Sequence, residues 1–186
     1  MLPARILRGL SDLLARIERL LLVLLVAGTA GFVLLNVGFR TFRMTIAWAD
    51  EAAVLCMVLT AFVGASLMLR MRSDPAVRLV HQVVSPAVGR GLRALVSTVA
   101  AGFGLVLGWM CWRWFDPAGL WAAGLDVAEF EMATFNFLYT ETTPVLRLPF
   151  WWFWLVLPWF ALTLTVHALT NLAEDAGLIP PAPSEG

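Results

Sequence analysis

The apolar stretch LLLVLLVAGTAGFVLLNVGF, residues 20–39, decides the fold class of this chain. It contains no charged side chain, and its length is the ~20 residues that an α-helix needs to cross the ~30 Å hydrocarbon core of a bilayer. Three further segments, residues 48–69, 92–114 and 150–169, are of similar length and largely apolar. We therefore predict an all-α membrane protein with four transmembrane helices.

The composition of the whole chain agrees with this prediction. Hydrophobic residues make up 60% of the 186 residues and charged residues 14%, whereas soluble proteins have ~45–50% and ~25%. So much apolar surface requires the lipid bilayer as a partner. The 13 basic and 13 acidic residues cancel, which argues against nucleic acid as a partner, because nucleic-acid binders carry a basic surface.

The arginines predict the orientation of the four helices. All 13 basic residues are arginines, and nine of them lie before the first segment or around the link between the second and third. Basic residues collect on the cytoplasmic side of membrane proteins, so we expect both termini in the cytoplasm. These nine are Arg5, Arg8, Arg16, Arg19, Arg70, Arg72, Arg78, Arg90 and Arg93.

The residues before the first segment are expected to form an amphipathic helix that lies on the membrane surface. Apolar residues recur there at helical spacing between charged ones: Ile6, Leu10, Leu13, Leu14 and Ile17. The alternative is a signal peptide cleaved near residues 28–30, but the apolar run continues past that point. Residues 77–84 are a candidate for a second surface helix. We predict one domain, residues 1–178, and a disordered, proline-containing tail, residues 179–186.

The link between the first two segments, residues 41–47, is short enough to make them an antiparallel hairpin. Arg40 at the end of one helix then approaches Asp50 and Glu51 at the start of the next, and we expect these charges to pair. Asn36 is expected to form a hydrogen bond to a neighbouring helix. An alternative reading makes Glu51 the proton-coupling group of a small stand-alone carrier, because ionisable residues in membrane segments are often functional.

No pattern in the sequence predicts an enzyme or a cofactor site. There is no phosphate-binding loop, zinc-protease motif or nucleotide-binding glycine pattern. Cys56 and Cys111 lie singly in apolar runs, and the two histidines, His81 and His167, do not occupy matching positions for a haem. We therefore expect no catalytic residue, no metal and no cofactor.

Small residues at four-residue spacing predict close helix packing. On the third segment they are Ala100, Gly104 and Gly108. The second segment has the pair Ala61 and Ala65, and the first segment has the pair Ala27 and Gly31. The spacing leaves open whether the packing partner lies in this chain or in another. The third and fourth segments also carry more aromatic side chains than a four-helix core needs: Trp109, Trp112, Trp114, Trp159 and Phe160. Some of these are expected to face lipid or a second protein.

Two short motifs stand out in the chain. The first runs from Asn36 and Arg40 to Trp48-Ala49-Asp50-Glu51, followed by Gly64-Ala65 and Arg70, and the second is Leu148-Pro149-Phe150-Trp151-Trp152 with Leu157-Pro158. Together they resemble the small membrane subunit, the DctQ-like or Q subunit, of tripartite ATP-independent periplasmic (TRAP) transporters. The resemblance covers residues 17–175 apart from the outer loop, and size, four spans, orientation and motif position agree with it.

The resemblance implies a multi-pass subunit of the bacterial inner membrane that has no transport chemistry of its own. Its partners would be a large membrane subunit, which carries the solute with sodium ions, and a periplasmic substrate-binding protein. The small subunit would brace the scaffold of the large one during uptake of a carboxylate-type solute. From the resemblance and from the residue spacing together, we expect a structural or interface role for seven residues: Asn36, Arg40, Trp48, Asp50, Glu51, Gly104 and Gly108.

The chain departs from the family pattern in two places. Family members often carry a histidine shortly after the arginine that ends the second span, whereas residues 70–76 here contain none. The outer loop, residues 115–148, also looks longer than the usual link. Four acidic residues of this loop are candidates for contact with the binding protein: Asp126, Glu129, Glu131 and Glu141. The alternative is that the loop is a lid packed over the bundle.

Overall fold

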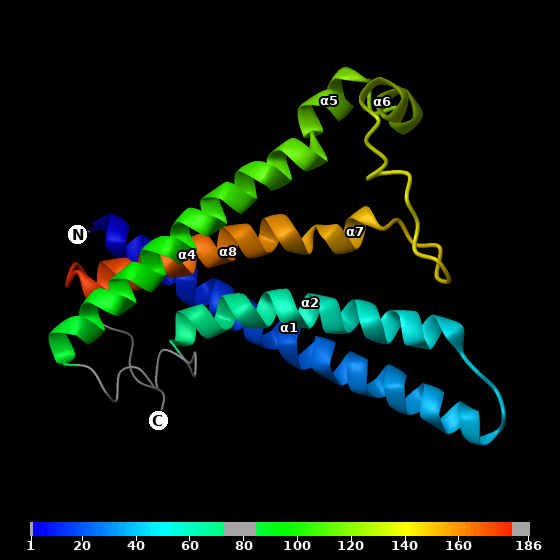
Figure 1. Cartoon of the computed structure of the whole chain (residues 1–186), viewed down its shortest axis with the longest axis horizontal. Helices are drawn as coiled ribbons and strands as arrows, with labels where there is room; N and C mark the ends of the chain where they lie inside the picture. The colour runs from blue at the N-terminus through cyan, green and yellow to red at the C-terminus, as the bar shows by residue number, and fades with distance from the viewer. Residues whose placement is uncertain (1, 73–84, 180–186) are drawn as a thin grey trace.

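The computed structural model describes residues 2–72 and 85–179, and the described part is dominated by long helices (Figure 1). The longest are α1 (Leu2–Thr41), α2 (Ala47–Met71), α4 (Pro86–Phe115) and α8 (Val156–Asp175), which the short helix α7 (Trp151–Trp154) precedes. Four helical stretches are long and apolar enough to cross a membrane: Arg5–Thr41, Ala47–Met71, Val88–Ala122 and Trp151–Asp175. The all-α class and the four candidate spans are confirmed.

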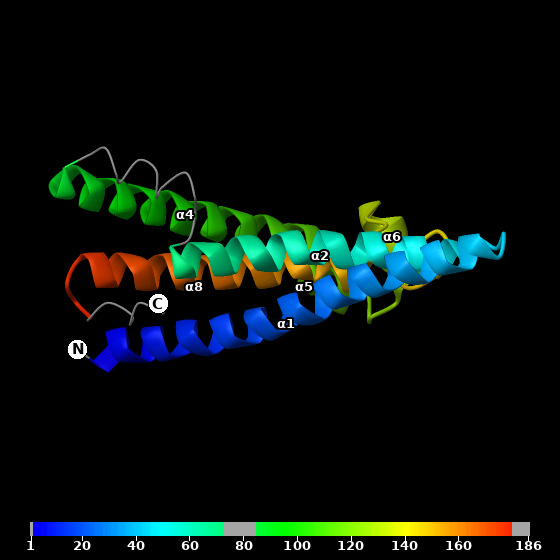
Figure 2. The same cartoon turned by 90° about the horizontal axis from the view of Figure 1, so that it is seen from below.

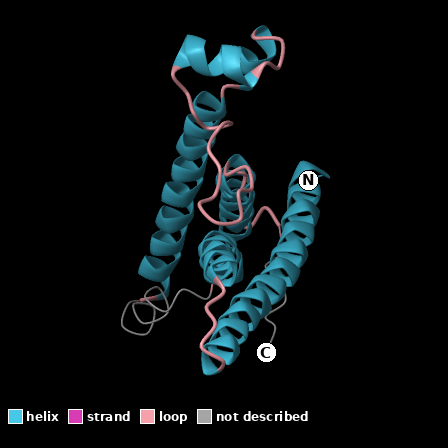
Figure 3. Cartoon of the chain, turned by 90° about the vertical axis from the view of Figure 1, so that its right-hand side faces the viewer, coloured by secondary structure: helices cyan, strands magenta, loops and turns pink. Residues whose placement is uncertain are grey.

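Helix α8 occupies the centre of the bundle. It packs against α4 on one side and against α1 and α2 on the other, and α1 and α2 pack along each other as a hairpin. Figure 2 shows the four long helices running along a common direction, and Figure 3 shows α4 and α1 on opposite sides of the central helices. Most of the fully buried side chains therefore belong to α8 or to residues that face it.

Gly104 sets the distance between α4 and α8. A Cβ atom at this position would lie 2.3 Å from Thr165 Oγ1 and 3.1 Å from the carbonyl oxygen of Ala161. Gly108 lies one turn further along the same interface, where a Cβ would meet Ala161 Cβ at 3.8 Å. The small residues of α4 thus find their packing partner within this chain, whereas Ala61 and Ala65 of α2 are exposed.

The fourth span is divided where the sequence places a proline. Pro158 has no backbone N–H to donate to the carbonyl of Trp154, four residues earlier. The helix is interrupted at that level, so that α7 ends at Trp154 and α8 begins at Val156. The proline therefore explains why this span consists of two helices.

The loop after α4 forms its own small layer at one end of the bundle. It contains α5 (Pro117–Ala122) and α6 (Val127–Thr134), and an isolated antiparallel bridge joins Thr142 to Pro149. Phe130 is buried against Tyr139, which in turn stacks edge-on against Phe115 and Trp151. This loop is thus packed against the ends of α4 and α7 by aromatic contacts.

The segment that was predicted to lie on the membrane surface and to lead into the first span is continuous with that span. Residues 2–41 form one uninterrupted helix. The reason is that the sequence offers no proline or glycine break between residues 10 and 27, so that the helix propagates without interruption. The predicted surface helix at 77–84 and most of the predicted tail, 180–186, lie outside the described residues.

Candidate functional site

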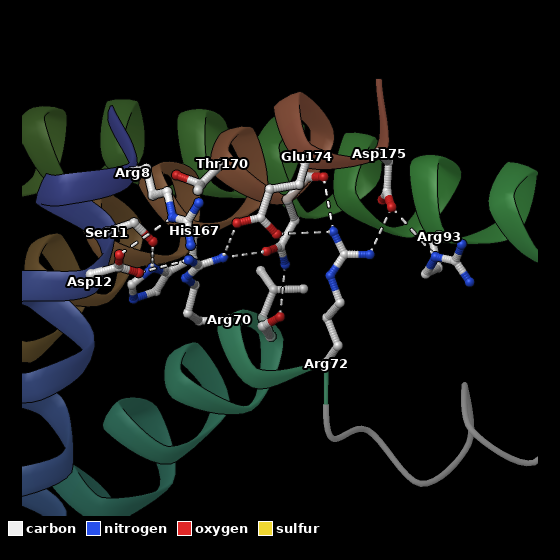
Figure 4. Close-up of polar contacts among 12 residues, drawn as sticks. Arg8, Ser11, Asp12, Arg70, Arg72, Arg93, His167, Thr170, Glu174 and Asp175 are labelled. Atoms are coloured by element: carbon white, nitrogen blue, oxygen red, sulfur yellow. Dashed lines mark hydrogen bonds and ion pairs between the residues drawn. The ribbon is translucent and has the colours of Figure 1, made fainter. Parts of the chain in front are cut away.

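The charged side chains that contact another segment of the chain lie mainly at the two ends of the bundle. One group, which we call the terminal cluster, lies where α1 begins and α2 and α8 end, and consists of Ser11, Asp12, Glu18, Arg70, Arg72, His167, Asn171, Glu174 and Asp175. Figure 4 labels all of these residues except Glu18 and Asn171. The other, the hairpin cluster, lies at the opposite end of α1 and consists of Asn36, Asp50 and Glu51.

Arg70, in the last turn of α2, is the centre of the terminal cluster. Its guanidinium donates to Asp12 Oδ1 of α1 at 2.7 Å and to Glu174 Oε1 of α8 at 3.0 Å. The same group donates to Asn171 Oδ1 at 3.2 Å, and the Asn171 amide donates to the carbonyl of Leu69 at 2.8 Å. The Arg70 and Glu174 side chains are only 6% and 3% exposed. One buried cation therefore joins three helices, and its charge is compensated by two carboxylates.

Arg72 and Asp175 extend the terminal cluster toward the surface. Arg72 ends α2 in the left-handed conformation with φ 50°, and its guanidinium donates to Asp175 Oδ1 at 2.8 Å and to the carbonyl of Asn171 at 3.0 Å. Arg93 of α4 forms an ion pair with the same Asp175 oxygen at 3.4 Å. All four long helices thus contribute to one network of charged contacts.

His167 connects α8 to α1 beside this network. Its Nε2 lies 3.0 Å from Glu18 Oε2 and its Nδ1 lies 2.7 Å from Ser11 Oγ. With the proton on Nε2, the ring donates to the Glu18 carboxylate and accepts a hydrogen bond from the Ser11 hydroxyl. All three side chains are fully buried, and Glu18 Oε1 has no hydrogen-bond partner. This chain of contacts holds the first half of α1 along α8.

The hairpin cluster differs from the predicted ion pairs. The Asn36 amide donates to the carboxylate of Asp50, and Asn36 Oδ1 accepts from the backbone N–H of Ile46 at 3.5 Å. In the described part of the chain Arg40 forms no ion pair with Asp50 or Glu51. The buried amide of Asn36 reaches the carboxylate across the hairpin, whereas Arg40 is exposed to solvent at the end of α1.

Glu51 connects the hairpin to the outer loop. Its Oε2 accepts hydrogen bonds from the backbone N–H groups of Val145 at 3.1 Å and Leu146 at 2.6 Å. Trp48, one turn earlier, is 43% exposed and contacts Phe32 of α1 edge-to-face. Of the residues selected from the sequence, Asn36 and Asp50 therefore contact each other, and Glu51 contacts the outer loop.

The four acidic candidates of the outer loop are not gathered into one site. Asp126 caps α6 by accepting from the N–H groups of Ala128 and Glu129. Glu129 and Glu141 are exposed, and Glu131 is half-buried. No group of three or more metal-ligating side chains occurs in the ranges 2–72 and 85–179.

Sequence reasoning missed the terminal cluster. A signal was present: Ser11 and Glu18 are seven residues apart, and Thr163, His167, Thr170, Asn171 and Glu174 recur at helical spacing on α8. Polar residues at that spacing in an otherwise apolar helix predict a buried polar face. The charged residues of the first helix were instead assigned to the membrane surface, which separated Glu18 and Asp12 from their partners.

A bundle with four membrane-crossing helices and with its ionised contacts at the helix ends defines a small multi-pass membrane protein. Residues 29–177 match the family described as Tripartite ATP-independent periplasmic transporters, DctQ component, and the chain belongs to this family. It is thus related to the small membrane subunit of TRAP transporters, as the sequence motifs indicated. No curated protein and no solved structure matches the chain.

Proposed function

We propose that this protein is the small membrane subunit of a TRAP transporter and braces the large membrane subunit during sodium-coupled uptake of a carboxylate-type solute. In this role it would reside in the bacterial inner membrane, with both termini in the cytoplasm, and would work with a periplasmic substrate-binding protein. The observation that supports the proposal is the placement of the charges. Arg70 and its partners, like Glu51, are engaged in contacts between segments of this chain.

A bracing subunit needs rigid helices rather than a polar path. Arg70 joins α1, α2 and α8, Gly104 allows α4 to approach α8, and Glu51 fastens the outer loop to α2. Between the two clusters the spans carry apolar side chains and hydroxyl groups such as Ser66, whose Oγ donates to Thr163 Oγ1 at 2.8 Å. These contacts favour a rigid support over a protein that moves a solute through its own centre.

The alternative function is a stand-alone carrier in which Glu51 takes up and releases a proton. Such a role requires the carboxylate to exchange protons and to change partners during transport. Glu51 instead accepts hydrogen bonds from two backbone N–H groups of the outer loop, and these contacts hold its carboxylate between α2 and the loop. The geometry therefore supports an anchoring role for Glu51 more than a coupling role.

Reconstitution distinguishes the two functions. Proteoliposomes that contain this chain alone are expected to show no uptake of carboxylates under a sodium or proton gradient. Uptake is expected when the large membrane subunit and the binding protein are added. Uptake by this chain alone that Glu51→Gln abolishes would establish the carrier instead. The glutamine variant of the complete transporter serves as the control, because the bracing function predicts retained uptake with a lower thermal stability.

The exposed acids of the outer loop provide a proposed contact for the binding protein. Glu129 and Glu141 are available for such a contact, whereas Asp126 already caps a helix. Replacing Glu129 and Glu141 by glutamine is expected to lower uptake at limiting binding-protein concentration and to leave the membrane complex intact. Equal uptake at every binding-protein concentration would argue for the loop as a packed lid without a docking role.

A further inference from the structure

The first half of α1 carries an exposed apolar stripe. Ile6, Leu10, Leu13 and Ile17 are 64%, 44%, 54% and 38% exposed, although they are the apolar face of an amphipathic helix. The side of the same segment that faces the bundle carries the polar residues Ser11 and Glu18. We call these four residues the α1 stripe. The apolar face of this segment is thus turned away from the other helices that the structure describes.

The α1 stripe cannot lie flat on a bilayer in this arrangement. Ser11, Asp12 and Glu18 are joined to His167 and Arg70, so the segment runs along membrane-crossing helices. A helix of 40 residues is ~60 Å long, twice the ~30 Å hydrocarbon thickness. Even a tilt of ~40° leaves it a height of ~46 Å, more than the whole bilayer. The charge-free part of α1, residues 20–39, is the part that suits the hydrocarbon core, so the end that extends beyond the lipid is the one that carries the α1 stripe. There the stripe needs another cover.

The spacing of the stripe predicts the shape of that cover. Ile6, Leu10, Leu13 and Ile17 follow one another at intervals of four, three and four residues, and the alternation continues to Leu20 and Leu24, which are 62% and 59% exposed. This alternation is the heptad repeat by which one helix packs along another in a coiled coil. A second helix that runs beside α1 from the membrane into the cytoplasm would cover it.

We propose that the α1 stripe is the docking surface for a helix of the large membrane subunit. This inference rests on the proposed function and adds the location of the contact. The partner helix would carry apolar residues at heptad spacing and a carboxylate that faces Arg16, because Arg5 and Arg16 are exposed beside the stripe. A second copy of this chain would bring like charges together there. The stripe precedes residues 29–177, so the family match does not include it.

Co-purification of the two membrane subunits tests the proposal. The variant Leu13→Gln/Ile17→Gln keeps the helix but removes the apolar contact, so the amount of large subunit recovered with it should fall at least tenfold. The matched control is Leu95→Gln/Val99→Gln, whose side chains are 59% and 63% exposed. They belong to α4, which lies on the other side of the central helices from α1 (Figure 3). The control should retain the large subunit to within twofold, and Arg16→Glu should give an intermediate loss.

A photo-activated cross-linking residue at position 13 of the otherwise unchanged complex makes the test independent of folding of the variant. A covalent product with the large subunit is the expected result. A product with a second copy of this chain, or with lipid alone, overturns the inference, as does equal loss from the stripe variant and the α4 control. If the wild-type subunits form a complex that the stripe variant does not weaken, only this inference fails. If they form no complex at all, the proposed function fails with it.

Discussion

Glu18 of α1 and His167 of α8 form a fully buried pair, with Glu18 Oε2 and His167 Nε2 3.0 Å apart. The two residues are 149 positions apart in the sequence, so the pair connects the first and last helices of the bundle. Ser11 holds the other ring nitrogen of His167. Because water cannot replace a lost partner at a buried site, this contact constrains the position of α1 strongly.

The first prediction concerns this pair. Glu18→Leu leaves His167 Nε2 without an acceptor and should lower the free energy of unfolding by about 2–5 kcal/mol. Glu18→Gln is the control, because its amide oxygen still accepts the hydrogen bond, and it should cost less than half as much. The double variant Glu18→Leu/His167→Leu should be more stable than the sum of the two single effects predicts, because it leaves neither the carboxylate nor the imidazole buried without its partner. Thermal unfolding of the protein in mild detergent measures these variants together with His167→Leu, the second single variant that the comparison requires.

The second prediction concerns the contact between α4 and α8. Gly104→Ala should destabilise the bundle by about 1–3 kcal/mol, because the new Cβ would collide with Thr165 Oγ1 and press on the backbone of α8. Thr165 cannot turn away freely, since its hydroxyl donates to the carbonyl of Ala161 at 2.7 Å. Gly102→Ala on the same helix is the control. Its Cβ would meet open space, so it should leave stability unchanged or raise it by up to about 1 kcal/mol.

These two contacts show how far the sequence predicts the structure. Apolar length was enough to place four spans, because the bilayer thickness fixes that length. Small-residue spacing identified Gly104 as a packing position, but its partner in α8 depends on how α4 and α8 are arranged in space. The sequence patterns considered do not encode which helices become neighbours in a bundle.

The charged residues illustrate the same limit. Asp50 and Glu51 were recognised as structural acids, but sequence proximity suggested Arg40 as their partner. The acids are instead held by Asn36 and by a backbone segment that lies 94 residues further along the chain. Arg70 was noted only as the end of a span, although it meets carboxylates from α1 and α8. Long-range partners of this kind follow from the packing of the helices and not from local spacing.

The third prediction compares Glu51 with Arg40. Glu51→Ala removes the acceptor of two backbone N–H groups in the outer loop and should cost about 1–3 kcal/mol of stability. Arg40→Ala should change stability by less than about 0.5 kcal/mol, because Arg40 is exposed and forms no ion pair with the acids. The rate of proteolysis within residues 140–150 of the folded protein measures how far the loop has loosened, and it should rise in Glu51→Ala and not in Arg40→Ala. A charge swap between Arg40 and Glu51 that restored stability would contradict this arrangement.

The fourth prediction is a pH effect in the outer loop. Burial raises the pKa of the Tyr139 phenol, and the negative charge of Asp116 raises this pKa further. In the unfolded chain the phenol ionises near its ordinary pKa of about 10. The folded loop keeps the phenol neutral to a higher pH, so the stability that this group contributes is fully present below pH ~10 and is lost as the pH rises through the folded pKa. Ionisation also removes the proton that Tyr139 donates to the carbonyl of Phe115 at 2.6 Å.

Absorbance titration measures this effect directly, because Tyr139 is the single tyrosine of the chain. The midpoint in the folded protein should lie above that of the protein unfolded in denaturant. Asp116→Asn should lower the midpoint without returning it to the unfolded value, since burial is the larger cause and the amide can still cap α5. Tyr139→Phe should abolish the absorbance change and lower stability by about 1 kcal/mol at neutral pH through loss of the hydrogen bond. A folded midpoint at or below the unfolded one would show that the phenol is solvated and that the loop is not packed against α4 and α7.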